Sequence, residues 1–288
     1  MKLLRRYTMY LLMTVPIVAL FFYFHTLPAL TGMYYSFTNW SGFGSIQWVG
    51  LKNFIGLFQD PQVMHSYLFT LEFAAVTTIL VNVISLLIAL ALNAKIFLSK
   101  TFKAIFFMPY VLGTLVVSYI FNYLFSNVIP TIATQFHWTA LTQNLLGTQY
   151  AWIGIVIVAC WQGAAFNTIL YLAGLQTIPE DVYEAAMIDG ASAWRRFWGV
   201  TFPLIAPFFT INMVLAAKTY LQVFDQIVAL TNGGPGNLTQ SVSFLIYTNG
   251  FSGGELAYQS ANAVVFLLLL LIVALVQLRF LQRREVQL

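Results

Sequence analysis

The chain has 288 residues, of which 60% are hydrophobic and only 8% are charged. Soluble domains carry about a quarter of charged residues, so this few charges cannot cover a water-exposed surface without large apolar patches. The composition excludes an ordinary soluble protein and indicates that lipid is the main solvent. The net charge of +4 does not indicate a nucleic-acid partner, because the basic residues form short clusters between apolar runs.

Six apolar stretches are long enough to cross a bilayer, which takes about 20 helical residues. The sequence therefore predicts an all-α polytopic membrane protein with six transmembrane helices. In chain order, the stretches cover residues 7–30, 67–92, 103–125, 151–175, 203–227 and 260–281.

The first stretch has two interpretations. Lys2, Arg5 and Arg6 precede it and resemble the basic start of a signal peptide. The apolar run, however, exceeds the usual length of about 7–15 residues, and no A-x-A-like cleavage site follows. We therefore expect a retained helix, which Pro16 and Pro28 kink or end.

The basic residues predict the orientation of the chain. With six helices, eleven of the thirteen lysines and arginines fall on one side of the membrane, and an odd number of helices would scatter them. The positive-inside rule then places both termini in the cytoplasm. Lys52 falls on the opposite side and Lys218 within a helix. The eleven are Lys2, Arg5, Arg6, Lys95, Lys100, Lys103, Arg195, Arg196, Arg279, Arg283 and Arg284.

The predicted outer loops are the longer ones, at about residues 38–66, 126–150 and 228–259. They are rich in Gly, Asn, Trp and Tyr. Aromatic residues at their edges suit the headgroup region of the bilayer, and they also suit a docking surface for an external partner. Examples are Trp40, Trp48, Trp138 and Trp152.

The loop between the fourth and fifth stretches, residues 180–202, predicts two short helices. A proline and two acids at 179–181 are typical of a helix start. Gly190 breaks the first helix, and residues 191–200 form a second, with aromatic residues at helical spacing. Pro203 is expected to open the fifth transmembrane helix. Such a loop is either an amphipathic helix in the headgroups or a rigid docking element that transmits a push to the flanking helices.

A resemblance decides between these two interpretations. The loop resembles the EAA loop of ABC-importer permeases, with the pattern E-A-A, then D-G, then a closing proline. This implies a type I importer fold in which the loop is a coupling helix seated in a cleft of the ATP-hydrolysing subunit. The ending Val200-Thr-Phe-Pro203 departs mildly from the family's Ile-x-Leu-Pro. The matching residues are Glu184, Ala185, Ala186, Asp189, Gly190 and Pro203.

Other segments resemble the carbohydrate branch of these permeases, the maltose-transporter-like and multiple-sugar-transporter-like proteins. The resemblance implies a single permease domain over residues 1–288, with the core importer helices at 67–281. The segments are Phe37-Thr38, Val49-Gly50-Leu51-Lys52-Asn53-Phe54, Asp60-Pro61, Phe107-Met108-Pro109 as the entry to the third helix, Phe224-Asp225-Gln226-Ile227 and Leu230-Thr231-Asn232-Gly233-Gly234-Pro235-Gly236.

The resemblance also implies partners in the cell membrane: a second homologous permease, two copies of an ATP-binding subunit, and an extracellular solute-binding protein that delivers a sugar. The chain has no G-x-x-x-x-G-K-[ST] phosphate loop. We therefore expect no enzyme activity and no cofactor in this chain, with ATP and Mg²⁺ used by the partner ATPase.

Polar residues inside the predicted helices are candidates for the substrate path, because such residues are costly in lipid and tend to face a cavity or another helix. The resemblance also places Gly163, Phe166, Thr219, Tyr220 and Val223 at family cavity positions, on the helices that flank the loop. The alternative is helix–helix packing through amides and small residues. The candidates are Gln162, Gly163, Phe166, Asn167, Thr219, Tyr220 and Val223.

Two charged residues stand seven positions apart in the fifth stretch. Lys218 and Asp225 would share one face of a continuous helix, about 10.5 Å apart along its axis, which is too far for a direct pair. Lys218 is expected at a cavity or a subunit interface. His25, His65 and His137 are scattered, and Cys160 is the only cysteine, so the sequence predicts no metal site, no catalytic residues and no intrachain disulfide.

Three alternatives are weighed against a sugar permease. Another polar solute, such as glycerol phosphate, suits the same branch. A self-sufficient secondary transporter is disfavoured, because no internal repeat is visible and six helices are few for that class. A membrane-embedded enzyme is disfavoured because the few acids do not converge.

Overall fold

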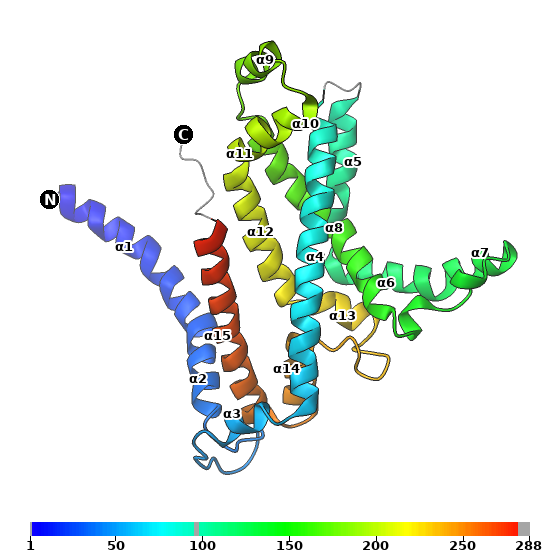
Figure 1. Cartoon of the computed structure of the whole chain (residues 1–288). Helices are drawn as coiled ribbons and strands as arrows, with labels where there is room; N and C mark the ends of the chain where they lie inside the picture. Colours follow the sequence, from blue (N-terminus) through cyan, green and yellow to red (C-terminus); the bar gives the residue numbers. More distant parts are fainter. Residues whose placement is uncertain (1, 95–97, 282–288) are drawn as a thin grey trace. The chain divides into compact units, whose positions relative to one another are not determined.

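The structure is a computed structural model that describes residues 2–94 and 98–281 (Figure 1). Its contacts divide the chain into two compact units. Unit 1 comprises Met1–Met64 and Leu245–Leu268, and unit 2 comprises His65–Phe244 and Leu269–Leu288. Within the described residues, both units are built from helices and connecting loops, with one isolated β-bridge between Thr38 and Trp48.

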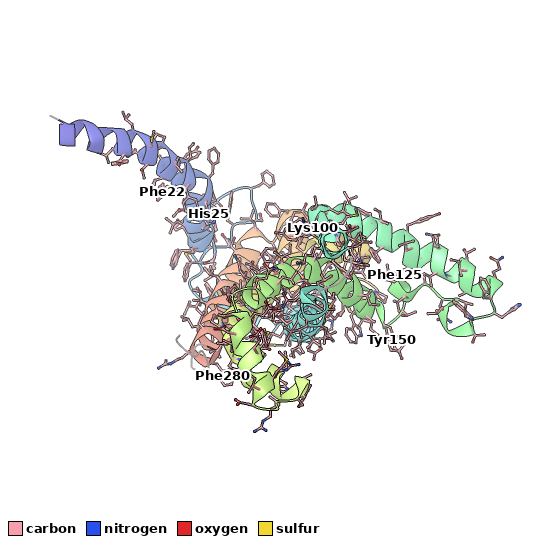
Figure 2. All side chains as sticks on the ribbon, turned by 90° about the horizontal axis from the view of Figure 1, so that it is seen from above. Phe22, His25, Lys100, Phe125, Tyr150 and Phe280 are labelled. Carbon is pink, nitrogen blue, oxygen red and sulfur yellow. The ribbon has the colours of Figure 1, made fainter. Side chains whose placement is uncertain are left out.

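Unit 1 begins with a long helix. α1 (Lys2–Phe21), a π-helical turn (Phe22–Thr26) and α2 (Leu27–Tyr35) follow one another without a break. Pro28 stands in the first turn of α2, where a missing N–H is tolerated. Side chains project from all around this helix, Phe22 and His25 among them (Figure 2), and the stretch Tyr10–Tyr35 is long and apolar enough to cross a membrane.

The loop that follows α2 in unit 1 is held by one asparagine. Asn53 lies in α3 (Lys52–Leu57), and its Nδ2 donates to the carbonyl oxygens of Ser36 at 2.9 Å and Thr38 at 2.8 Å. These bonds satisfy backbone groups that have left α2. The loop residues that resemble the sugar branch therefore include the one that ties this loop together.

An aspartate starts the next helix. Asp60 Oδ1 accepts the backbone N–H of Gln62 at 2.9 Å and so caps α4 (Pro61–Asn93). The Tyr258 hydroxyl donates to the other oxygen of Asp60 at 3.2 Å. Unit 1 also contains the end of α14 (Val242–Tyr247) from Leu245 onward, a π-helical turn (Thr248–Ser252), and the part of α15 (Leu256–Leu281) up to Leu268.

Unit 2 holds the rest of α4 and the helices that follow it. Figure 1 shows that α9 and α10 lie at the end of this unit where α4 ends and α5 begins, whereas α13 lies toward the other end. The further helices are α5 (Ser99–Val111), α6 (Thr114–Tyr123), α7 (Ile129–Gln135), α8 (Ala151–Leu175), α9 (Glu180–Ile188), α10 (Ala193–Arg196), α11 (Phe202–Leu204), α12 (Ala206–Leu221) and α13 (Asp225–Leu230). Short 3₁₀ or π turns lie at Leu124–Val128, Thr139–Leu141, Leu145–Gly147 and Phe197–Thr201.

The core of unit 2 is built around α8. Apolar side chains of α4, α8, α12 and α13 form one buried cluster that includes Val81, Ile155, Val158 and Ile227, all fully buried. Alanines and glycines on α8 let the neighbouring helices approach closely, as is usual between membrane helices. α8 matches the predicted fourth helix, residues 151–175, at both ends.

The third predicted helix, 103–125, is wrong in its bounds. The helix breaks at Leu112 and Gly113, which are both extended, and α6 and α7 extend sideways from α4, α5 and α8 (Figures 1 and 2). Pro109 therefore lies near the end of α5 rather than at a helix entry. It removes an N–H and prepares the break.

The fifth predicted helix, 203–227, is also shorter than expected. A bend of 70° at Ile205 separates Ala193–Leu204 from Ala206–Leu221, so Pro207 rather than Pro203 opens the straight helix. α12 then ends at Leu221, before a separate α13. Within the described residues, five helices are long and apolar enough to cross a membrane, or six if the bent pair is one of them.

Candidate functional site

The loop after α8 folds as the sequence predicts. Glu180 and Asp181 occupy the first turn of α9, where negative charge interacts favourably with the helix dipole. Gly190 ends the helix with a φ of +70°. Its N–H bonds to the carbonyl of Met187 at 3.0 Å, and the Ala191 N–H bonds to that of Ala186 at 3.0 Å. This pair of bonds is a Schellman motif, in which glycine adopts the left-handed conformation at no steric cost.

The residues predicted to couple to an ATPase lie together at the tip of this loop. Glu184, Ala185, Asp189 and Gly190 are exposed, and Ala186 is half-buried. A Cβ added at Gly190 would meet nothing within 4 Å, so its backbone conformation, not lack of space, requires glycine. The loop thus offers a short, rigid helix end with an accessible surface, and Ile188 beside it is 87% exposed.

The second half of the loop is an aromatic cluster. Trp194 and Phe197 each pack against Trp198, with ring centroids 5.7 and 5.0 Å from it. The Tyr183 hydroxyl on α9 lies 3.2 Å from Thr201 Oγ1. This bond joins the two halves of the loop.

The loop is anchored to the membrane helices at its bend. Ile205 is fully buried in a second apolar cluster. The cluster also contains Tyr171, Leu172 and Leu175 from the end of α8, and Ala89 from α4. The bend is therefore packed against the ends of α4 and α8 and, through Phe209, against α12.

A cleft of about 480 Å³ lies beside α8 and α12 in unit 2. Six of the seven residues predicted for the substrate path line it, and Val223, which is 3% exposed, is buried in the core instead. The structure also adds lining residues from the break between α5 and α6 and from α13. The predicted lining residues are Gln162, Gly163, Phe166, Asn167, Thr219 and Tyr220, and the added ones include Tyr110, Leu112, Gly113, Thr114 and Gln226.

The missing side chain at Gly163 makes room for the hydroxyl of Tyr220. A Cβ at Gly163 would overlap the Tyr220 hydroxyl and press on Val81. That hydroxyl donates to the carbonyl oxygen of Ala159 at 3.2 Å. The absence of a side chain at position 163 thus lets the Tyr220 ring cross from α12 to α8 at the wall of the cleft.

Gln162 stabilises the break in the neighbouring helix. Its Nε2 donates to the carbonyl oxygen of Leu112 at 2.9 Å, which has no helical partner because the helix ends there. On the next turn of α8, Phe166 stacks on Tyr110, with ring centroids 5.0 Å apart. The sequence analysis did not predict this wall of the cleft. Its signals in the sequence are Pro109, just before the break, and Gly113, within it.

Asn167 belongs to a polar contact between α8 and α12. Asn212 Nδ2 donates to the carbonyl oxygen of Asn167 at 3.3 Å. Within the described residues, Asn167 Nδ2 and Asn212 Oδ1 have no hydrogen-bond partner. One turn along α8, the Tyr171 hydroxyl donates to Asn82 Oδ1 at 2.7 Å. Two unsatisfied amide atoms are thus buried between α8 and α12, and of the two residues only Asn167 lines the cleft.

Lys218 and Asp225 do not share a helix face, contrary to the sequence prediction. α12 ends at Leu221, which leaves Lys218 exposed in its last turn and Asp225 in the first turn of α13. Each position suits the local helix dipole. Neither residue lines the cleft, whose described wall carries no charged side chain.

Comparison with protein families matches residues 81–286 to the binding-protein-dependent transport system inner membrane components. The chain belongs to this family. The match includes the last part of α4 and the whole of the loop and the cleft. As an inner membrane component, the chain is a multi-pass membrane protein, in agreement with its long apolar helices.

Relatives match along almost the whole length. A probable starch degradation products transport system permease protein of Thermoanaerobacterium thermosulfurigenes is 37% identical, covering 91% of this chain and 89% of its own. A multiple sugar-binding transport system permease protein of Streptococcus mutans is also 37% identical, covering 99% of both chains. An sn-glycerol-3-phosphate transport system permease protein of Brucella abortus is 31% identical, covering 93% of both.

A solved structure has the same fold. It is a bacterial ABC transporter involved in the import of the acidic polysaccharide alginate, with a TM-score of 0.83, 22% identity, and coverage of 98% of this chain and 97% of the other. The predicted fold class, an ABC-importer permease, is thereby confirmed.

Proposed function

We propose that this chain is a permease subunit of a binding-protein-dependent, ATP-driven importer of a sugar or oligosaccharide. The observation that carries the proposal is the 37% identity, over 99% of both chains, to a permease named for multiple sugars. The cleft has the chemistry that such a solute needs. Amides, hydroxyls and aromatic rings line it, and these groups match the hydroxyls and apolar faces of a sugar ring.

A sugar is favoured over glycerol phosphate by the charge of the cleft. The relatives named for sn-glycerol-3-phosphate are also similar to this chain, so this solute is the second candidate. Recognition of a phosphate is usually provided by arginine, lysine or a helix start. The cleft wall described here carries no arginine or lysine, and Lys218 lies outside it. A neutral solute therefore suits it better.

The proposed mechanism needs partners. Glu184, Ala185, Ala186, Asp189 and Gly190 contact one of two ATP-binding subunits, which use ATP and Mg²⁺. A second permease forms the other half of the path, and an external solute-binding protein delivers the sugar. The rigid loop supports this proposal, because its bend is packed against α8 and α12, the helices that line the cleft.

Substitution at Gly190 tests the coupling role in the assembled importer. Gly190→Pro fixes φ near −65° and removes the N–H that bonds to Met187, whereas Gly190→Asn tolerates the left-handed conformation. In proteoliposomes loaded with ATP, we expect Gly190→Pro to reduce radiolabelled-sugar uptake at least tenfold and Gly190→Asn to retain most of it.

The coupling role would be contradicted if the Gly190→Pro importer still co-purified with its ATPase and took up sugar as fast as the unchanged importer. The solute is tested separately by competition. Unlabelled oligosaccharides are expected to compete for uptake, and competition by glycerol phosphate alone would favour the second candidate.

A further inference from the structure

A groove of about 540 Å³ lies between the loop and the membrane helices of unit 2, apart from the cleft. One wall is apolar and comes from helices that cross the membrane. Leu87 and Leu90 belong to the last turns of α4, and Leu175 ends α8. Leu87 is exposed and Leu90 half-buried on this wall, whereas Leu175 is buried behind them, so an acyl chain can lie along the two leucines of α4.

The opposite wall is polar and comes from the loop. It contains the Trp194 ring, the Arg196 guanidinium and the hydroxyl-bearing residues Tyr183 and Thr201. Arg196 is the one charged residue in the described lining, and no carboxylate faces it there. Arg196 is also half-buried, whereas its neighbour Arg195 is exposed and does not line the groove.

We propose that this groove binds an anionic phospholipid, whose phosphate pairs with Arg196 and whose acyl chain packs on Leu87 and Leu90. A basic pocket between membrane helices on the cytoplasmic side is the kind of site that binds anionic headgroups. Tryptophan at the rim suits the interfacial region of the bilayer. The inference uses the cytoplasmic location of the loop that belongs to the proposed function.

A lipid fits the groove better than the ATPase does. None of the five predicted coupling residues lines the groove, so the groove and the loop tip can be occupied at the same time. Two of the groove walls, α4 and α8, lead into the bilayer and away from the ATPase. The bound headgroup would then join the end of α4 to the loop and hold the loop in one orientation.

Lipid retention by the assembled importer tests the proposal without measuring transport. The complex is exchanged into detergent with an equal mixture of phosphatidylglycerol and phosphatidylcholine, and bound lipid is counted by native mass spectrometry. We expect selective retention of phosphatidylglycerol. Arg196→Gln is expected to reduce it about fivefold, the change that loss of one interfacial cation produces. Arg195→Gln, the matched control, and Arg196→Lys are expected to retain it.

A second variant and a competition experiment test the proposal independently of Arg196. Leu87 is 62% exposed, so Leu87→Trp leaves the core intact but fills the apolar wall, and it is expected to lower retention even if Arg196→Gln does not assemble. Inorganic phosphate is expected not to displace the lipid. Equal loss in Arg195→Gln and Arg196→Gln, full retention in Leu87→Trp, or displacement by phosphate would overturn the proposal. None of these outcomes bears on whether the importer carries a sugar.

Discussion

Gly163 shows how one residue shapes the wall of the cleft. The side chain missing at this position leaves room for the Tyr220 hydroxyl, which bonds to α8 through Ala159. Small residues at helix contacts in membranes usually permit close backbone approach. Here the glycine instead admits a large polar ring from the facing helix, and the ring closes one side of the cleft.

Replacing Gly163 by alanine is expected to force Tyr220 out of its position and break its bond to Ala159. Overpacking of this kind costs about 1–3 kcal/mol, so the melting temperature of the purified importer and sugar uptake should both fall. The double variant Gly163→Ala/Tyr220→Phe lacks the clashing hydroxyl and should recover part of the stability. Equal melting temperatures for Gly163→Ala and the unchanged protein would show that the contact is loose.

At the scale of elements, the break between α5 and α6 determines the shape of unit 2. Pro109 and Gly113 make the break possible, and Gln162 on α8 stabilises it by donating to the exposed carbonyl of Leu112. Without that donor, the carbonyl would be left unsatisfied beside lipid and core, which is costly. The direction of α6 and α7 therefore depends on a bond between residues 50 positions apart.

Gln162→Leu is expected to destabilise the importer by about 1–3 kcal/mol, because a buried carbonyl loses its partner. The melting temperature should fall, and limited proteolysis should cut more readily between α5 and α6. Gln226→Leu is the matched control, because Gln226 lines the same cleft but its side chain makes no hydrogen bond within the described part of the chain. Equal shifts in the two variants would assign the effect to the cleft as a whole rather than to the break.

At the scale of the molecule, the open question is which end of unit 2 faces the cytoplasm. The loop of α9 and α10 lies at the end where α4 ends and α5 begins (Figure 1), so Lys100, Lys103, Arg195 and Arg196 gather there. The basic residues at 95, 283 and 284 lie outside the described residues. The cytoplasmic location of both termini stays a prediction, as does a single permease domain over the whole chain.

Thiol labelling of intact cells tests this orientation. Cys160 is buried, so it gives a low background and can be replaced by alanine. Leu238, in the glycine-rich loop that is predicted to lie outside, is 44% exposed, and Leu238→Cys is expected to react with a membrane-impermeant maleimide. Gln176→Cys, at the exposed end of α8, should react only after the cells are opened. The reverse pattern would place the loop outside and contradict the coupling role.

The sequence predicted most of the helices, because lipid requires every spanning segment to satisfy its own backbone and so makes the apolar stretches long and visible. It also predicted the loop, because the acids of its first turn and Gly190 act through local backbone geometry. Six of the seven path residues line one cleft. Their prediction rested on the cost of polar groups in lipid and on the resemblance to the cavity positions of the family, not on local pattern alone.

What only the tertiary structure decided is where these helices break and what each break exposes. Hydropathy does not distinguish a continuous apolar helix from two helices joined at Leu112, at Ile205 or after Leu221. The distinction depends on partners distant in sequence: Gln162 for the first break, and the buried cluster around Ile205 for the second. The breaks separated Lys218 from Asp225, moved Tyr110 and Thr114 into the cleft wall, and buried Val223. Local composition sets which segments enter the membrane, but the packing of one helix against another sets where each of them bends.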